Sequence, residues 1–278
     1  MNLDIRYSNH PDDSKKYDTE ELRKHYLIKK VFAEDEINFT YSHQDRIIAG
    51  GIMPVTKVLS LESCKELAAD FFLQRREMGI INIGGSGKVT LDGVCYALNF
   101  QDGMYVGMGT KEVVFESLDE KNPAKFYINS CPAHKTYKTV FITKDVARHV
   151  PCGDAANLNK RVINQYVHPQ VCDSCQLVMG MTELDKTSVW NTMPCHTHER
   201  RMEIYTYFEI AENNAVFHMM GEANETRHIV MNNFDAVISP SWSIHSGVGT
   251  SNYSFIWAMG GENQAFDDMD TLKTTELK

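Results

Sequence analysis

Long apolar runs are missing from this sequence. No stretch approaches the roughly 18 consecutive apolar residues of a membrane-spanning helix, so we expect no membrane span and no membrane partner. Residues 1–26 are polar and charged and contain no apolar signal-peptide stretch. Positive charge is also scarce, since 28 Lys and Arg stand against 37 Asp and Glu, a net charge of -9. A general nucleic-acid binder would show a basic patch or stripe, so no nucleic-acid partner is expected.

A disulfide framework is also not indicated. The seven cysteines are an odd number and are scattered along the chain, at Cys64, Cys95, Cys131, Cys152, Cys172, Cys175 and Cys195. This usage is typical of reduced thiols in a cytoplasmic protein. Cys172 and Cys175 form a single CxxC pair without a second pair, which we interpret as two thiols in or near a strand and not as a zinc site.

Helical patterns are few. The segment from Asp18 to Phe32 predicts a helix, because it begins with an N-cap residue, has acidic residues in its first turn and ends in a basic turn. A second short helical pattern lies within residues 60–72. Residues 263–278 predict a final turn or a short helix.

Most of the remaining chain predicts short strands separated by Gly, Asn and Asp. Residues 88–91 and 94–98 are joined by Asp92-Gly93, a two-residue hairpin turn. The second half repeats this style, with predicted strands within residues 188–194, 201–210, 215–221, 226–232, 235–249 and 253–261. The sequence therefore predicts a mainly β fold, a barrel or sandwich, with a few short helices.

The two halves of the chain resemble each other. Residues 73–85 align with residues 198–210 at an offset of 125 residues if the two Arg-Arg pairs are matched. We therefore predict two tandem copies of one barrel, residues 1–152 and 153–278, with the boundary in the loop-like segment 148–161.

One motif in the second half indicates a metal site. His196 and His198 are separated by one residue, so on a strand both imidazoles face the same side. Glu203 follows five residues later, and a turn or bulge must bring it to that side. His245, after Pro240, is the best candidate for a ligand from another strand. Three imidazoles and one carboxylate suit zinc, iron, manganese, nickel or cobalt, and HxH, Glu and a later Pro and His form the cupin signature.

The internal repeat limits this site to one half. At the four matching positions the first half carries Phe71, Leu73, Met78 and Glu112. Three of the four are apolar and suit the core of a barrel that holds no metal. We therefore predict one metal per chain, in the second barrel only.

Longer stretches resemble the 5-keto-4-deoxyuronate isomerase family, also called 4-deoxy-L-threo-5-hexosulose-uronate ketol-isomerases. The resemblance runs from about Asp18 to Asp270 and is most specific in NTMPCHTHERRMEIYTYF and ISPSWSIHSGVGTSNYSFIWAMGG. It implies a two-cupin enzyme that forms a homo-hexamer, with one zinc per subunit. It also implies that a small deoxyuronate, 5-dehydro-4-deoxy-D-glucuronate, is interconverted with 3-deoxy-D-glycero-2,5-hexodiulosonate in bacterial pectin breakdown. The four implied ligands are His196, His198, Glu203 and His245.

An aldose-ketose isomerisation moves a proton between neighbouring carbons, through an enediolate whose negative oxygen a divalent metal can stabilise. The sequence does not identify the proton-transfer base. His218, His228 and Glu183 are candidates, and for each a structural role is the alternative.

The acidic substrate also requires a cation, because an Arg fork matches a carboxylate. Arg200, Arg201 and Arg227 are the candidates. A matching arginine pair, Arg75 and Arg76, occurs in the half without ligands, so a structural role for the pair at 200 and 201 is the alternative.

Two other functions are compatible with the predicted barrel and its ligand set. An iron-dependent dioxygenase is compatible with these ligand types, and it would consume oxygen, whereas an isomerase works anaerobically. A non-enzymatic sugar-binding or storage cupin is the second alternative, and the intact ligand set in one half argues against it.

Overall fold

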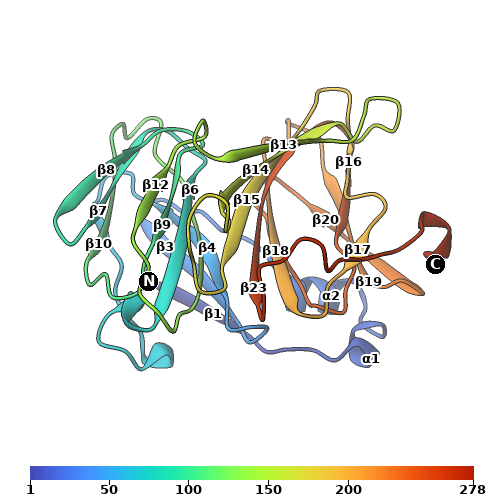
Figure 1. Ribbon diagram of the computed structural model, residues 1–278, viewed down its shortest axis with the longest axis horizontal. Coiled ribbons are helices and arrows are strands. Elements are labelled where there is room, and N and C mark those ends of the chain that lie inside the picture. The colour runs from blue at the N-terminus through green and yellow to red at the C-terminus, as the bar shows by residue number, and fades with distance from the viewer. The chain divides into compact units, whose positions relative to one another are not determined.

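The computed structural model describes residues 1–278, and Figure 1 shows a chain built mainly of β-strands. The chain forms two compact units. The first contains Met1–Arg6, Lys30–Arg148 and Tyr166–Met179, and the second contains Tyr7–Lys29, His149–Gln165 and Gly180–Lys278. The sequence predicts two continuous halves, 1–152 and 153–278, whereas in the structure each unit includes a segment from the other half of the chain.

The first unit contains a seven-stranded and a four-stranded sheet. The larger sheet has the order β1 (Asn2–Arg6), β3 (Glu36–Ser42), β4 (Ile48–Met53), β11 (Phe126–Pro132), β6 (Arg76–Asn82), β9 (Gly103–Val106) and β12 (Val140–Ile142). The smaller sheet has the order β5 (Leu59–Ser60), β10 (Val113–Ser117), β7 (Gly87–Leu91) and β8 (Val94–Leu98).

The second pair of sheets has the same arrangement of strands as the first. The seven-stranded sheet has the order β13 (Arg148–Cys152), β14 (Arg161–Val167), β15 (Val178–Leu184), β23 (Ser254–Gly261), β18 (Arg201–Phe208), β21 (Ala236–Ser239) and β2 (Leu27–Ile28). The four-stranded sheet has the order β16 (Trp190–Asn191), β22 (Ser246–Gly249), β19 (Val216–Glu222) and β20 (Glu225–Met231). A short pair joins β17 (His196–Thr197) to β24 (Asp270–Thr271).

The strand registers confirm the predicted repeat. Met78 of β6 pairs with Val106 of β9, and Glu203 of β18 pairs with Ser239 of β21. Met78 and Glu203 are therefore equivalent positions, as the offset of 125 residues predicts. Each copy consists of two separate sheets and not of one continuous closed sheet. The predicted mainly β fold of two tandem copies is confirmed.

The predicted hairpin is present between β7 and β8. Asp92 and Gly93 have φ values of 45° and 85°, the left-handed conformation that a two-residue turn of this kind requires at both positions. The prediction succeeded because Asp-Gly adopts this conformation at little cost.

The helices are shorter than predicted. Helix α2 (Thr19–Tyr26) begins as predicted, with the Asp18 carboxylate accepting the N–H of Glu21 at 2.8 Å. It ends six residues before Phe32, because Leu27–Ile28 joins a sheet beside β21 as strand β2. A four-residue helix, α1 (Pro11–Ser14), precedes it. No helix of the structure is long and apolar enough to cross a membrane.

The helix predicted within residues 60–72 does not form. Only two 3-10 turns occur there, η1 (Lys65–Leu67) and η2 (Phe72–Gln74), and Ala68 ends the first with φ of 47°, outside the helical region. At the C-terminus the predicted short element is the 3-10 turn η3 (Thr274–Glu276). The predicted boundary loop is partly strand β13.

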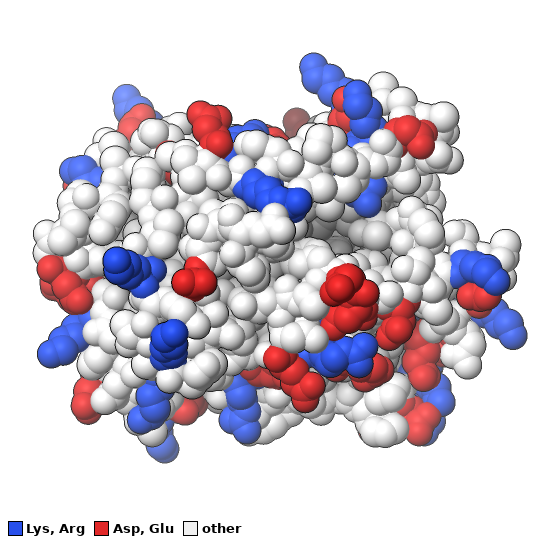
Figure 2. Space-filling view, in the orientation of Figure 1, with Lys and Arg blue, Asp and Glu red and all other residues white.

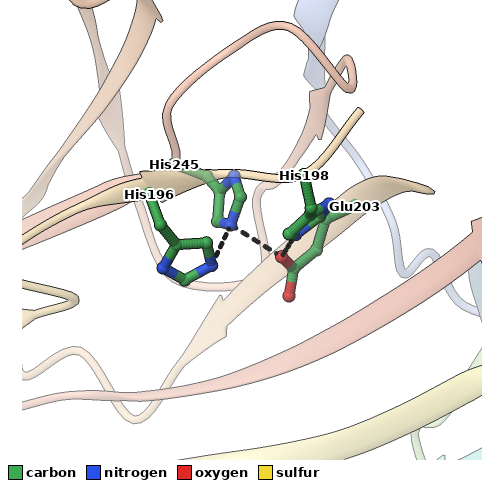
Figure 3. Close-up of side chains that lie close together, drawn as sticks. All are labelled: His196, His198, Glu203 and His245. Carbon is green, nitrogen blue, oxygen red and sulfur yellow. Dashed lines mark hydrogen bonds and ion pairs between the residues drawn. The ribbon is translucent and has the colours of Figure 1, made fainter. Parts of the chain in front are cut away.

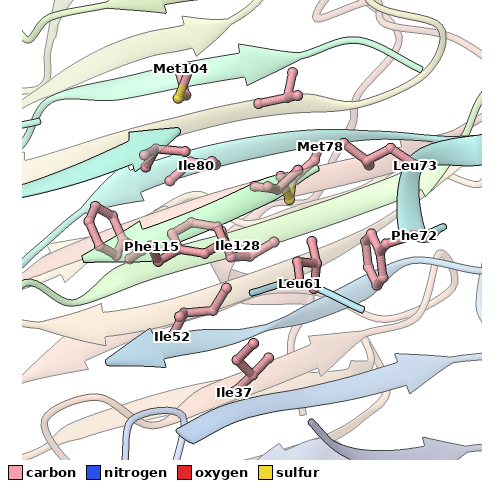
Figure 4. Close-up of a cluster of buried hydrophobic side chains, with 14 of the residues drawn as sticks. Ile37, Ile52, Leu61, Phe72, Leu73, Met78, Ile80, Met104, Phe115 and Ile128 are labelled. Atoms are coloured by element: carbon pink, nitrogen blue, oxygen red, sulfur yellow. The ribbon is translucent and has the colours of Figure 1, made fainter. Parts of the chain in front are cut away.

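The core of the first unit occupies the place where the second unit has its polar cluster. Leu73 and Met78 are fully buried among apolar side chains such as Ile80 and Ile128, as Figure 4 shows. Glu112, the counterpart of His245, is exposed. The interior at these positions is therefore stabilised by apolar packing.

One buried carboxylate organises a loop of the first unit. Glu77 is fully buried and accepts hydrogen bonds from the backbone N–H groups of Cys175, Gln176 and Leu177 at 2.6 to 2.9 Å. The Tyr105 hydroxyl donates a fourth hydrogen bond at 2.8 Å. Burial, together with the charge of Glu77, raises the pKa of Tyr105 above its usual value, so the phenol remains a donor.

Replacement of Glu77 should therefore destabilise the protein. Glu77→Ala leaves several buried donors without an acceptor, and we expect a loss of about 3–5 kcal/mol and a fall of the unfolding midpoint by at least ~5 °C in calorimetry. Glu112→Ala is the control, since its side chain is exposed, and it should leave the midpoint within ~1–2 °C. Equal midpoints for the two variants would contradict this role of Glu77.

Candidate metal centre

The four side chains predicted as ligands converge in the second unit. His196 lies in β17, His198 follows that strand, Glu203 lies in β18 and His245 directly precedes β22. Their ligand atoms all lie within 4.8 Å of one another, and Figure 3 shows them pointing toward a common centre. The relative exposed areas are 9% for His196 and 5% or less for the other three, so water has little access.

A tight turn places Glu203 beside the histidines. The N–H of Arg201 donates to the carbonyl of His198 at 3.2 Å, which reverses the chain through Glu199 and Arg200 before β18 begins. This is the turn that the sequence requires between the two parts of the motif. Glu203 is then fixed by strand pairing on both sides of β18.

The distances within the cluster match those between ligands of one metal ion. Nε2 of His245 lies 3.0 Å from Nε2 of His196 and 2.9 Å from Oε2 of Glu203. Nε2 of His198 lies 3.3 Å from the same oxygen. Nitrogen and oxygen ligands at ~2.0–2.2 Å from a metal are separated by roughly 2.9–3.5 Å from one another. The donor set and its spacing therefore fit a divalent cation.

Backbone groups orient the imidazoles. Nδ1 of His198 lies 2.8 Å from the carbonyl oxygen of Arg201 and donates to it. The lone pair of Nε2 then faces the cluster, which is the arrangement usual for metal-binding histidines. Arg201 therefore fixes His198 through its own backbone carbonyl.

Electrostatic effects favour the metal-binding protonation states of His196 and Glu203. At His198 burial acts to lower the pKa, but the hydrogen bond to Glu203 outweighs it and raises the pKa. Burial, together with the neighbouring His245, lowers the pKa of His196 to about 3. Burial acts to raise the pKa of Glu203, but the neighbouring His245 and His198 outweigh it and hold that pKa below its usual value. A neutral imidazole and an ionised carboxylate are the forms that bind a cation.

A cavity of about 380 Å³ adjoins the cluster, and His196 and Glu203 form part of its wall. This volume lies within the range of small-molecule sites, ~300–1,000 Å³. Figure 2 shows the molecule hollowed on this side, to the right of centre. The other lining side chains include an apolar group, Phe255, Trp257, Met259, Phe266 and Met269, and a polar group, Arg161, Thr182, Asn191, Thr192, Tyr205 and Thr271.

The three predicted base candidates do not line this cavity. His218 is fully buried between Tyr207 and Ser239, at 2.8 and 3.4 Å, and burial lowers its pKa to about 3. His228 is exposed beside the ring of Phe217. Glu183 accepts a hydrogen bond from the side-chain amide of Asn164 at 2.9 Å.

The three predicted carboxylate-binding arginines also lie outside the cavity wall. Arg201 is fully buried, and its guanidinium donates to both carboxylate oxygens of Asp268 at 2.8 and 3.0 Å. Arg200 pairs with the same Asp268 at 3.2 Å. Arg227 donates to the carbonyl oxygens of Lys15 and Tyr17. All three guanidinium groups are therefore bound to other parts of the chain.

The cation that does line the cavity is Arg161, the first residue of β14. In the sequence it is the last residue of the predicted boundary segment, 148–161. The arginine at position 76, the counterpart of Arg201, is buried as well and donates to Ser130 and to the carbonyl of Arg46. The shared arginine position therefore holds buried polar contacts in both units.

Solved structures with the same fold are known at low sequence identity. An IolB-like protein from Salmonella typhimurium has a TM-score of 0.71 at 12% identity, over 89% of this chain and 96% of that chain. An oxalate decarboxylase from Lactobacillus farciminis has a TM-score of 0.54 at 10% identity, over 81% and 79%. Both likenesses concern the fold alone, and they agree with the cupin-type architecture predicted from the sequence.

Two other proteins have a much higher sequence identity to this chain. A protein from Enterococcus faecalis, 4-deoxy-L-threo-5-hexosulose-uronate ketol-isomerase 2, is 56% identical over 276 residues, 99% of this chain and 100% of its own length. An Escherichia coli 4-deoxy-L-threo-5-hexosulose-uronate ketol-isomerase is 56% identical over 278 residues, with the same coverage. The model of the KduI/IolB family matches residues 26–274. The chain therefore belongs to the KduI/IolB family and is an enzyme of the ketol-isomerase class.

Proposed function

We propose that this enzyme interconverts 5-dehydro-4-deoxy-D-glucuronate and 3-deoxy-D-glycero-2,5-hexodiulosonate in the breakdown of pectin and related uronate polymers. The observation that carries the proposal is the buried cluster of three imidazoles and one carboxylate beside a cavity of about 380 Å³. The names of relatives that are 56% identical over their full length support the choice of substrate.

The proposal includes one divalent metal per subunit, zinc in the first instance, held by His196, His198, Glu203 and His245. When bound, such an ion supplies a Lewis acid for the carbonyl and hydroxyl oxygens of a sugar. The first unit has no equivalent donor set, since three of its matching positions are Phe71, Leu73 and Met78.

The chain itself supplies the environment for proton movement. The apolar wall of Phe255, Trp257 and Met259 limits water beside the sugar. Burial, reinforced by the negative charge of Glu203, raises the pKa of Tyr205 well above its usual value, although the positive charge of Arg161 acts in the opposite direction. The Tyr205 phenol therefore keeps its proton at neutral pH and can donate a hydrogen bond to a substrate oxygen.

The group that removes the carbon-bound proton stays a prediction. His218, His228 and Glu183 do not line the cavity. We therefore propose that the base is a group that lines the cavity beside the cluster. A homo-hexamer and a cytoplasmic location complete the proposed function. The family resemblance supports the hexamer, and the scattered cysteines support the location.

Metal binding should depend on Glu203 and not on its neighbour Glu199. Glu203→Gln removes the anionic ligand, and we expect metal affinity to fall by at least ~10-fold, since even the loss of an outer partner costs ~10–100-fold. Glu199 is exposed in the turn, so Glu199→Gln is the matched control. Elemental analysis after equilibration with limiting zinc measures both, and equal metal content in the two variants would reject this ligand set.

Turnover should require the metal and should not require oxygen. We expect the purified protein to isomerise freshly made 5-dehydro-4-deoxyuronate under anaerobic conditions, to lose activity on treatment with a chelator and to recover it with zinc. His196→Ala should lose both metal and turnover. A metal-containing protein that shows no anaerobic turnover but consumes oxygen would replace the isomerase proposal with an oxygen-dependent reaction.

A further inference from the structure

Arg161 is the one cation in the wall of the cavity. It opens strand β14, and the same wall contains His196 and Glu203 of the candidate metal centre. No lysine and no other arginine lines this space. Among the side chains of this wall, Arg161 is therefore the one basic group that can pair with an anion.

The guanidinium of Arg161 retains unused donors. One nitrogen, Nη1, donates to the carbonyl oxygen of Asn159 at 2.9 Å. Nε is buried and has no hydrogen-bond partner, and no carboxylate of the chain pairs with this side chain. A buried N–H without an acceptor costs free energy, and a guanidinium presents five N–H donors in a fork that matches a carboxylate. The unsatisfied atom points to an acceptor that comes from outside the chain.

The backbone that carries Arg161 is fixed in place. The carbonyl of Leu158 accepts the N–H groups of Val189 and Trp190, at 2.8 and 3.0 Å. The carbonyl of Lys160 accepts the N–H of Asp185 at 2.9 Å. The backbone from which Arg161 extends therefore needs little reorganisation when a ligand binds.

The surroundings increase the need for such a cation. The protein has a net charge of -9, and Figure 2 shows acidic side chains gathered below the hollow. An anionic sugar is repelled by this surface, so its binding depends on a specific positive group inside the cavity.

We infer that Arg161 binds the carboxylate of the sugar acid, and that it thereby orients the reacting carbons toward the metal centre and excludes neutral sugars. The inference rests on the proposed function, because it names the residue that recognises the acidic end of that substrate. Arg161 thus replaces Arg200, Arg201 and Arg227 as the candidate that binds the substrate carboxylate.

The experiment compares the acid with its methyl ester. Binding of 5-dehydro-4-deoxyuronate and of its methyl ester to the zinc-loaded protein is measured by calorimetry, and kcat and KM are measured for both. Four proteins are compared: the parent, Arg161→Gln, Arg161→Lys, and Lys160→Gln as the matched loss of an adjacent positive charge outside the cavity wall. Metal content and the unfolding midpoint are measured for all four.

In the parent and in Lys160→Gln we expect the acid to bind roughly 10- to 100-fold more tightly than the ester. Arg161→Gln should remove this preference and raise KM for the acid by a similar factor, with unchanged metal content and unfolding midpoint. Arg161→Lys should restore part of the preference, since it keeps the charge and loses the fork.

Two results separate the failure of this inference from the failure of the proposed function. If the parent turns over the acid and Arg161→Gln retains the preference for acid over ester, Arg161 does not bind the carboxylate, although the isomerase proposal stands. If the parent binds the acid through Arg161 but does not isomerise it, the carboxylate role stands and the proposed reaction fails. A parent without any preference for the acid would also overturn the role of Arg161.

Discussion

The hydrogen bond between Nδ1 of His198 and the carbonyl of Arg201 is the contact on which the rest of the site depends. It orients one imidazole, and a second hydrogen bond between the same two residues, from the N–H of Arg201 to the carbonyl of His198, closes the turn that brings Glu203 to the same side. The guanidinium of Arg201 is anchored at the same time on Asp268, near the C-terminal end of the chain. A single residue at the start of β18 therefore couples the metal cluster to a segment more than sixty positions away in the sequence.

The two units show how one strand plan accommodates two kinds of interior. The strand orders are the same, and Met78 and Glu203 occupy equivalent places in them. In the first unit apolar packing fills the interior, whereas in the second unit charged and polar groups face one another in a buried place. Such a polar cluster is stable only when every member has a partner, and a bound cation supplies one for all four.

The sequence predicts those features that depend on local patterns. The hairpin at Asp92 and the convergence of the four candidate ligands follow from turn chemistry, the alternation of strands and the repeat. It fails where tertiary pairing decides the outcome. Leu27 is not helical, because it pairs with strand β21. Residues 60–72 have a helical pattern, but it is too short to form a stable helix by itself.

Arg161 could not be found from local patterns either. It is a single basic residue that follows a loop, and only the folded chain shows that it lines a cavity and that its Nε lacks an acceptor. The more conspicuous arginines at 200 and 201 are bound to Asp268 instead. The place of an isolated charge depends on which elements surround it, and the sequence does not encode this in any short motif.

The repeat has a consequence for how the two halves tolerate substitution. At Met78 a replacement has to fit a volume, because its neighbours are apolar and close-packed. At Glu203 it has to preserve a charge and a lone pair, because its neighbours are imidazoles. Position 78 therefore tolerates several apolar residues of similar size, whereas position 203 tolerates only glutamate. Differences in sequence between the two units would then indicate which of the two interiors contains the reactive groups.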